Sequence, residues 1–208
     1  MTQKTIGKDT NMIAIIDYGV GNLFSLSASL RYIGAEAIVT GKEDDLAAAD
    51  RIILPGVGAF GDAADKLVAS GLVDAIKQEA ASGKPLLGIC VGMQLLFERS
   101  HEYGIHDGLS LVPGEVDRIP TDLKLPQIGW NSLTIKEDPL FKYTKQGDYV
   151  YFVHSYAATG CEPDTIATTE YGTTVTAAVR KGNVWGTQFH PEKSGKVGLA
   201  ILKAFTEL

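Results

Sequence analysis

The sequence predicts an α/β fold: a three-layer sandwich with a mostly parallel central sheet and an added antiparallel sheet. Two features of the chain support this prediction. In the first half, short apolar runs alternate with helical patterns, which is typical of right-handed βαβ units around a parallel sheet buried on both faces. In the second half, short segments rich in β-branched and aromatic residues are separated by turn residues, which indicates antiparallel strands.

The first half contributes four buried strands and four helices. Apolar residues recur at helical spacing from Leu23 to Ile33, and Gly34 ends that helix as its cap. The predicted strands cover residues 12–16, 35–40, 51–54 and 85–89, and the predicted helices cover residues 23–33, 59–69, 72–82 and 91–99.

The second half contributes six strands and a closing helix. Lys181-Gly182-Asn183 has the composition of a tight hairpin turn between the last two strands. The predicted strands cover residues 114–119, 127–135, 149–157, 165–170, 175–181 and 184–189, and the closing helix covers residues 194–208.

The chain is expected to form one domain over residues 12–208, because no repeat, low-complexity segment or linker interrupts it. Met12 stands directly before the first strand. Residues 1–11 are therefore interpreted as an N-terminal extension or a cloning remnant.

The bulk composition is that of an ordinary globular protein, with 45% hydrophobic and 21% charged residues. The formal net charge of −6 argues against a general nucleic-acid or anionic-membrane surface. No apolar run approaches the roughly 20 residues that cross a bilayer, and the start of the chain lacks the apolar core of a signal peptide. Two cysteines without Cys-x-x-Cys spacing indicate a reducing compartment, so we expect a cytoplasmic location.

Two glycine-rich loops follow predicted strands. The loop from Gly19 to Phe24 lies where a dinucleotide fingerprint would lie, but Phe24 replaces its third glycine, which favours a tight βα turn over a nucleotide site. The second loop, LPGVGAFGDA, leaves the backbone uncovered at Gly56 and Gly58. Uncovered N–H groups at a helix start can bind a developing oxyanion, although an ordinary flexible turn fits the same sequence.

Cys90 is a candidate nucleophile. A lone cysteine in apolar surroundings is commonly a packed core residue. Here, however, the segment Gly88-Ile89-Cys90-Val91-Gly92 has the form of a nucleophile elbow between a strand and a helix. The two glycines allow a sharp turn that would present the thiol at the sheet edge, near the positive end of the following helix. The N–H of Val91 would point into the same space.

Four histidines are candidates for the base that a cysteine nucleophile needs. His101 and His106 lie in a polar stretch and are interpreted as surface residues. His154 ends a strand, where it either contacts a substrate or packs. No pair of Cys or His residues has i, i+4 or Cys-x-x-Cys spacing, so the sequence predicts no metal site, and no Walker sequence or other cofactor motif is present.

His190 is the strongest of the four candidates. It precedes Pro191, which restricts His190 to extended geometry. Residues two apart in an extended segment project to the same side, so Glu192 can reach and orient the imidazole. A strand followed by an ordinary turn is the alternative interpretation of this segment.

These motifs resemble those of the class I, triad-type glutamine amidotransferases, whose fold is flavodoxin-like. The segments GICVGMQLLF and FHPEKS carry this resemblance. Four further segments, DYGVGNLFSL, LPGVGAFGDA, PQIGWN and YFVHSY, resemble more narrowly the glutaminase subunits of imidazole glycerol phosphate synthase. The resemblance covers nearly everything after Met12.

The resemblance implies that the chain hydrolyses L-glutamine through a γ-glutamyl thioester and releases ammonia. It assigns the catalytic triad to Cys90, His190 and Glu192. It assigns the oxyanion hole to the N–H of Val91 and to the loop at Val57 and Gly58. It assigns contacts with the substrate to Gln94, His154, Ser155 and Tyr156, of which Gln94 could instead be an exposed helix residue.

The resemblance also implies a partner, because a chain of this length has no room for a synthase domain. The expected partner is a (β/α)8-barrel cyclase subunit, joined as a heterodimer. It uses ammonia to convert the ribulosyl nucleotide PRFAR to imidazole glycerol phosphate and AICAR in histidine biosynthesis. The residues expected at or near the interface are Asn22, Trp130 and Lys193.

Two other functions compete with this one. The chain could be the glutaminase of another synthase, such as anthranilate, aminodeoxychorismate or pyridoxal phosphate synthase. It could also be a flavodoxin-like binding protein whose cysteine is inert.

Overall fold

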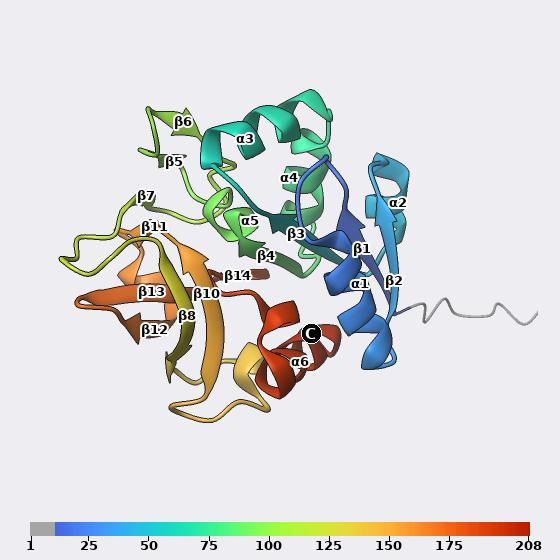
Figure 1. Cartoon of the computed structure of the whole chain (residues 1–208). Helices are drawn as coiled ribbons and strands as arrows, with labels where there is room; N and C mark the ends of the chain where they lie inside the picture. Colours follow the sequence, from blue (N-terminus) through green and yellow to red (C-terminus); the bar gives the residue numbers. More distant parts are fainter. Residues whose placement is uncertain (1–10) are drawn as a thin grey trace, which may run out of the picture.

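The computed structural model describes residues 11–208 (Figure 1). The predicted extension lies outside the described residues, apart from Asn11. Within the described residues, the chain forms an eight-stranded sheet, a four-stranded sheet and a two-stranded sheet. In Figure 1 the parallel strands occupy the right and centre of the view, and the antiparallel strands gather on the left.

The eight-stranded sheet runs in the order β2-β1-β3-β4-β14-β13-β12-β9. Its first five strands are parallel: β2 (Glu36–Thr40), β1 (Met12–Ile16), β3 (Arg51–Gly56), β4 (Leu86–Cys90) and β14 (Val184–Thr187). Its last three strands are antiparallel: β13 (Thr174–Lys181), β12 (Thr165–Glu170) and β9 (Thr134–Ile135). The predicted α/β class with a mostly parallel sheet agrees with this topology.

The strands of the second half differ from the prediction, because several of them continue the central sheet instead of forming a separate one, and β14 also pairs in parallel with β4. The predicted hairpin is the reason. Lys181 pairs with Val184, so the turn holds only Gly182 and Asn183 and places β13 directly beside β14. Gly182 adopts the positive φ of 59° that such a turn requires.

The two smaller sheets lie beside this antiparallel part. One pairs β10 (Tyr149–His154) with β8 (Gln127–Ser132). The other has the order β11 (Tyr156–Thr159), β7 (Glu115–Arg118), β5 (Arg99–Ser100) and β6 (His106–Asp107).

Two strands predicted as continuous are each divided between sheets. Residues 149–157 split at Ser155, whose carbonyl accepts a hydrogen bond from the N–H of Ile119, so that the chain passes from β10 to β11. Residues 127–135 split at Leu133, whose N–H donates to Asp148 before the chain joins the central sheet as β9. Periodicity cannot reveal such a change of sheet, because the residues on both sides of it keep the strand pattern.

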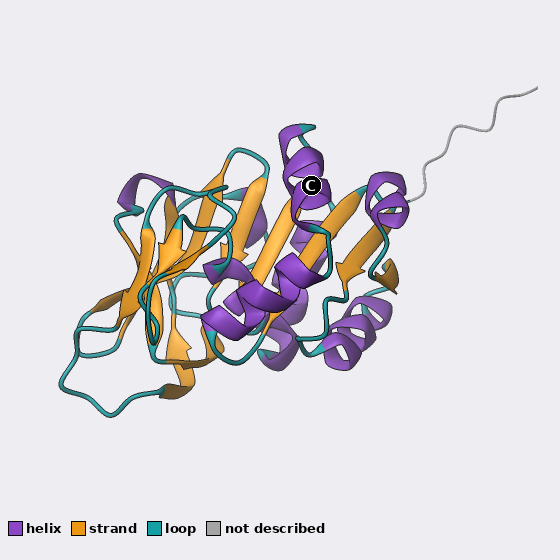
Figure 2. Ribbon diagram, turned by 90° about the horizontal axis from the view of Figure 1, so that it is seen from above, coloured by secondary structure: helices purple, strands orange, loops and turns teal. Residues whose placement is uncertain are grey.

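Helices lie on both sides of the central sheet (Figure 2), as expected for three layers. The α-helices are α1 (Leu23–Tyr32), α2 (Glu43–Ala48), α3 (Phe60–Ala69), α4 (Val73–Ala81), α5 (Val91–Gln94) and α6 (Gly195–Thr206). The 3-10 helices are η1 (Pro139–Phe141), η2 (Glu162–Asp164) and η3 (Pro191–Lys193). The sequence did not predict α2, which buries only Leu46 and so lacks an apolar periodicity.

The predicted helix over residues 91–99 is wrong in length, because α5 ends after one turn. The carbonyls of Leu95, Leu96 and Phe97 accept hydrogen bonds from the backbone of residues 109–112 and are not available to continue the helix. All three side chains are buried, so this tertiary packing outweighs the helical pattern of the sequence.

The core is continuous from the parallel strands to α6. All five residues of β4 are buried, and four of the five in β1 are buried. Sheet strands that carry helices on both faces need such uninterrupted apolar runs. Among the described residues, no helix is both long enough and apolar enough to span a membrane.

Candidate active site

Cys90 lies at the carboxyl end of β4, at the bend into α5. Its φ is 56° and its ψ is −113°, a backbone conformation that non-glycine residues rarely adopt. A Cβ on Gly92 would lie 1.9 Å from the carbonyl oxygen of Leu54, and a Cβ on Gly88 would lie 2.6 Å from the carbonyl oxygen of Gly92. Both glycines are therefore required, and the bend has the strained geometry of a nucleophile elbow.

The second glycine loop packs directly against this elbow. A Cβ on Gly56 would lie 2.4 Å from the backbone nitrogen of Gly92, so the two backbones are in direct contact. The buried hydroxyl of Tyr18 donates to the carbonyl of Pro55 at 2.7 Å and fixes the start of the loop. Burial raises the pKa of Tyr18, and the charge of nearby Cys90 adds to the rise, so this hydroxyl keeps its proton.

His190 reaches the same region from the chain after β14. Its backbone is extended, as Pro191 predicts, with φ −97° and ψ 99°. Its N–H donates to the carbonyl of Tyr151 at 3.0 Å, and the Ser194 hydroxyl donates to the carbonyl of His190 at 2.6 Å. The backbone of the histidine is therefore held from two sides.

Glu192 meets the imidazole, but not for the predicted reason. It lies in the 3-10 helix η3 rather than in an extended segment, and the turn swings its carboxylate back toward His190. The His190 Nδ1 lies 2.8 Å from Glu192 Oε1, and the two side chains are only 2% and 3% exposed. A carboxylate can only accept, so Nδ1 carries the proton and Nε2 is left for Cys90.

The protonation of His190 follows from these neighbours. Burial alone lowers the pKa of the imidazolium, but hydrogen bonds and charge attraction from Cys90 and Glu192 outweigh it and raise that pKa to about 9. His190 is therefore a cation at neutral pH, and it stands beside the sulfur as a proton donor. A buried cysteine sulfur, a protonated imidazole and a buried carboxylate form one connected group.

This group opens into a pocket of about 370 Å³. Besides Cys90 and His190, the walls include most of the residues singled out from the sequence, namely Val57, Gly58, Val91, Gln94, His154, Ser155, Tyr156 and Lys193. Glu192 does not line the pocket, because it lies behind His190. A larger hollow of about 820 Å³ over residues 135–146 has neither a cysteine nor a histidine in its walls.

Gln94 and His154 are buried polar residues of the pocket rather than exposed ones, at 3% and 6% exposure. The His154 Nδ1 lies 2.8 Å from the carbonyl of Tyr156, which can only accept, so Nδ1 carries a proton. Burial, with a smaller contribution from the charge of His190, lowers the pKa of His154 to about 4. The neutral ring therefore presents Nε2 as an acceptor that has no protein partner among the described residues.

The three residues expected at a partner interface lie around this site. Asn22 precedes α1 and lines a small cavity behind the triad together with Glu192. Trp130 is 52% exposed on β8 and packs edge-on against Tyr151. Lys193 is exposed at the rim of the pocket.

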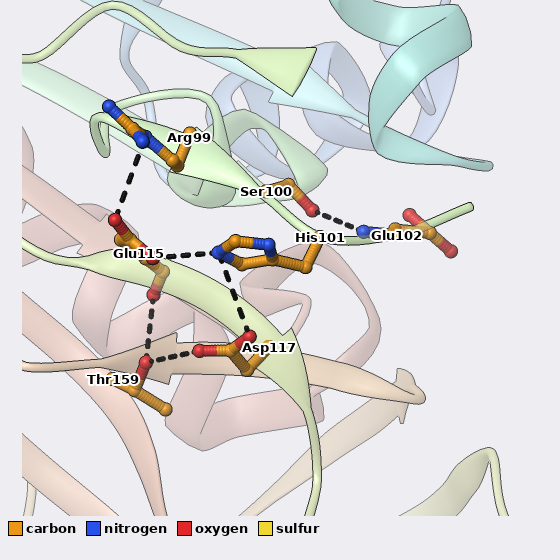
Figure 3. A network of polar contacts seen from close by, with 7 residues as sticks. All are labelled: Arg99, Ser100, His101, Glu102, Glu115, Asp117 and Thr159. Carbon is orange, nitrogen blue, oxygen red and sulfur yellow. Dashed lines mark hydrogen bonds and ion pairs between the residues drawn. The ribbon is translucent and has the colours of Figure 1, made fainter. Parts of the chain in front are cut away.

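A second histidine–carboxylate group lies on the four-stranded sheet (Figure 3). The His101 Nε2 lies 2.7 Å from Glu115 Oε2 and 4.0 Å from Asp117 Oδ1, and these three residues could in principle hold a cation. Arg99 and Thr159 also contact their carboxylates, as Figure 3 shows. None of the five lines the pocket of Cys90.

The two histidines predicted at the surface differ in the structure. His101 is exposed, as expected. The prediction for His106 is wrong, because the residue is half-buried. Its ring packs over Gly61 of α3, where a Cβ would lie 2.7 Å from the imidazole. The absence of a side chain at Gly61 therefore leaves room for the ring.

Sequence reasoning missed three polar residues of the site: Tyr18, Glu102 and Gln188. Tyr18 holds the glycine loop, and the Glu102 carboxylate accepts from the N–H of Phe60 at 2.7 Å, at the start of α3. Gln188 is fully buried next to Cys90. A signal existed for Gln188, because it precedes His190 by two residues at the end of a strand and so projects to the same side.

The chain matches the family model described as glutamine amidotransferase class-I over residues 14–207. It therefore belongs to the class I glutamine amidotransferases. Similar curated proteins are named imidazole glycerol phosphate synthase subunit HisH. That of Caldanaerobacter subterraneus subsp. tengcongensis is 52% identical, covering 95% of this chain and 98% of that protein. That of Methanosarcina mazei is 51% identical, covering 94% and 98%. Within the class, the chain groups with these HisH subunits, which confirms the narrower resemblance.

Solved structures support the fold independently. A structure described as a glutamine amidotransferase aligns with a TM-score of 0.75 at 19% identity, covering 94% of this chain and 97% of that one. The PurLQS structure from Thermotoga maritima aligns with a TM-score of 0.74 at 20% identity, with the same coverage. The predicted fold class is confirmed.

Proposed function

We propose that this chain hydrolyses L-glutamine at Cys90 and supplies the ammonia to imidazole glycerol phosphate synthase in histidine biosynthesis. The observation that carries the mechanism is the buried Cys90–His190–Glu192 group at the wall of a pocket. The assignment to this particular synthase is supported by sequence similarity. The chain is about half identical to proteins named imidazole glycerol phosphate synthase subunit HisH.

In the first half-reaction, the sulfur of Cys90 attacks the carbon of the glutamine side-chain amide. The tetrahedral intermediate collapses when the His190 imidazolium gives its proton to the nitrogen, and ammonia leaves. The carbon–nitrogen bond is broken and a γ-glutamyl thioester is formed. The raised pKa of His190 suits this step, because the ring is already protonated when glutamine arrives.

In the second half-reaction, the now neutral His190 accepts a proton from water, which attacks the thioester and releases glutamate. Glu192 keeps the proton on Nδ1 throughout, so that Nε2 is the atom that exchanges protons. In both half-reactions negative charge develops on the substrate oxygen. We assign its stabilisation to the N–H of Val91 and to an N–H at Val57 or Gly58, which lie on the pocket wall.

The pocket also contains groups that suit the amino-acid end of glutamine. His154 presents a neutral acceptor, which suits an α-ammonium group. We assign Gln94, His154, Ser155 and Tyr156 to this end of the substrate, since they line the same pocket as the sulfur. The volume of about 370 Å³ accommodates a free amino acid.

In this proposal the chain carries out only the hydrolysis of glutamine, so a second chain consumes the ammonia. We propose a (β/α)8-barrel cyclase subunit as that partner, and an interface that includes Asn22, Trp130 and Lys193. Support comes from the exposed aromatic ring of Trp130 and the exposed cation of Lys193 near the pocket. The product pair would be imidazole glycerol phosphate and AICAR, made from PRFAR.

The decisive experiment measures two activities of Cys90→Ser in complex with the cyclase. Glutamine hydrolysis should fall on the order of 10⁴–10⁶-fold, whereas product formation from added ammonium and PRFAR should survive, because serine leaves the fold intact. Cys161→Ser is the matched control, since Cys161 is the other free cysteine and is also buried. Loss of both activities in Cys90→Ser would contradict the proposal.

A further inference from the structure

Gln188 occupies a position that the mechanism above does not use. It follows β14 directly, and the register that places Thr187 beside Ile89 brings it next to Cys90. The side chain is fully buried, and the backbone N–H donates to Ala177 at 2.8 Å. A buried amide of this kind needs hydrogen-bond partners, so its contacts indicate its role.

The side chain of Gln188 joins the sulfur to a residue of the substrate pocket. Its Nε2 lies 3.9 Å from the Cys90 Sγ. Its Oε1 accepts a hydrogen bond from the Nε2 of Gln94 at 3.0 Å. The same Nε2 of Gln94 donates its other hydrogen to the carbonyl of Tyr156 at 3.1 Å. Two amides in series therefore connect the carbonyl of Tyr156 to the nucleophile.

The direction of this series is fixed at its far end. The carbonyl of Tyr156 can only accept, so Gln94 must turn its NH₂ group toward it. The second N–H of that group then needs an acceptor, and Gln188 must supply its oxygen. The NH₂ group of Gln188 is consequently the end that faces the sulfur. The carbonyl of Tyr156 therefore determines, through Gln94 and Gln188, that the sulfur faces a hydrogen-bond donor and not an acceptor.

We propose that Gln188 is a positioning residue of the glutaminase: its amide N–H holds the Cys90 sulfur in its anionic form and couples it to Gln94 in the substrate pocket. This inference rests on the proposed function and deepens it. A donor stabilises a thiolate more than a neutral thiol, because hydrogen bonds to charged groups are stronger. The stabilisation is lost on the thioester, whose sulfur is neutral, and it returns as deacylation restores the thiolate.

The test measures alkylation of Cys90 by iodoacetamide as a function of pH, without any glutamine present. Peptide mass spectrometry separates Cys90 from Cys161. Gln188→Met has nearly the same volume and no donor, so the pH of half-maximal alkylation should rise by about half a unit to one unit. Gln188→Glu keeps the shape and places an anionic oxygen near the sulfur, so the rise should be larger.

The coupling is tested at Gln94, whose side-chain hydrogen bonds go to Tyr156 and Gln188 and not to the sulfur. Gln94→Met leaves the Gln188 amide free to rotate, so it should shift the alkylation profile in the same direction, by less. The double variant Gln94→Met with Gln188→Met should shift it no further than Gln188→Met alone. Gln127→Met is the matched control: Gln127 is equally buried, and its amide has no hydrogen-bond partner among the described residues.

The outcomes separate this inference from the proposed function. An unchanged alkylation profile in folded Gln188→Met or Gln188→Glu would overturn the role of Gln188. If either variant fails to fold, an unchanged profile in Gln94→Met overturns it equally. The same shift in Gln127→Met would mean that any buried amide has this effect, which also overturns it. Failure of the unsubstituted chain to hydrolyse glutamine would instead count against the proposed function.

Discussion

Two histidine–glutamate pairs with nearly the same hydrogen-bond length lie in different regions of this molecule. His190 and Glu192 are 2.8 Å apart, and their side chains are 2% and 3% exposed. His101 and Glu115 are 2.7 Å apart, and their side chains are 37% and 38% exposed. The bond length therefore does not distinguish a buried pair beside the pocket from a surface pair.

The surroundings do distinguish them. The inner pair has a third member, Cys90, and a pocket beside it, so its charges act on each other with little solvent screening. The outer pair shares its carboxylate with Arg99 and lies in contact with solvent (Figure 3). The hydrogen bond from His101 lowers the pKa of Glu115, but water and salt weaken such an exposed pair.

Among changes to the two pairs, the largest expected effect is that of His190→Ala. Removing the group that carries the proton in both half-reactions should lower kcat for glutamine by about 10²–10⁴-fold. Steady-state glutamate release measures this, and circular dichroism checks that the variant is folded. A variant that is folded and retains normal turnover would show that the inner pair is structural, like the outer one.

Glu192→Gln should have a smaller effect. The amide can still contact the ring, but it no longer favours a proton on Nδ1 or stabilises the imidazolium, so turnover should fall by about one to two orders of magnitude less than in His190→Ala. The same assay compares the two variants side by side. Equal losses in equally folded proteins would contradict the assigned division between proton transfer and orientation.

The pH dependence of the inner pair should also be visible. Because the folded-state pKa of His190 is raised to about 9, kcat/KM should fall as the pH rises through that value, by about tenfold per unit above it. The stabilisation that this pair gives the fold has the same sign: it is complete below the ordinary histidine pKa and is lost as the pH rises through about 9. Rate–pH profiles of the native chain measure the first effect. A limb centred near the ordinary pKa of histidine would contradict the assigned charge state.

The smallest expected effect is that of His101→Ala. An exposed ion pair contributes little to stability, so kcat for glutamine should stay unchanged and the melting temperature should change only slightly. Thermal unfolding at low and at high salt measures the remaining contribution, which salt should remove. A clear loss of turnover would show that the outer group acts on the pocket and would end the distinction between the two pairs.

The sequence alone determined the fold class and the four parallel strands of the first half, and it singled out Cys90 and His190 as candidates for catalysis. Each of these depends on local chemistry: uninterrupted apolar runs in β1 and β4, two glycines around Cys90, and Pro191 after His190. Such signals are short-range, so they are readable without knowing what packs against them.

Only the tertiary structure decided the rest. Several features depend on partners that are distant along the chain. They are the changes of sheet at Leu133 and Ser155, the early end of α5 and the half-buried position of His106. The same holds for the hydrogen bonds of Gln188, which lead to a carbonyl in another sheet. It also holds for the protonation of His190 and His154, because burial and neighbouring hydrogen-bonding or charged groups together set a pKa and the sequence states neither. Residue types and spacing specified which groups the site contains, and packing specified their charges and directions.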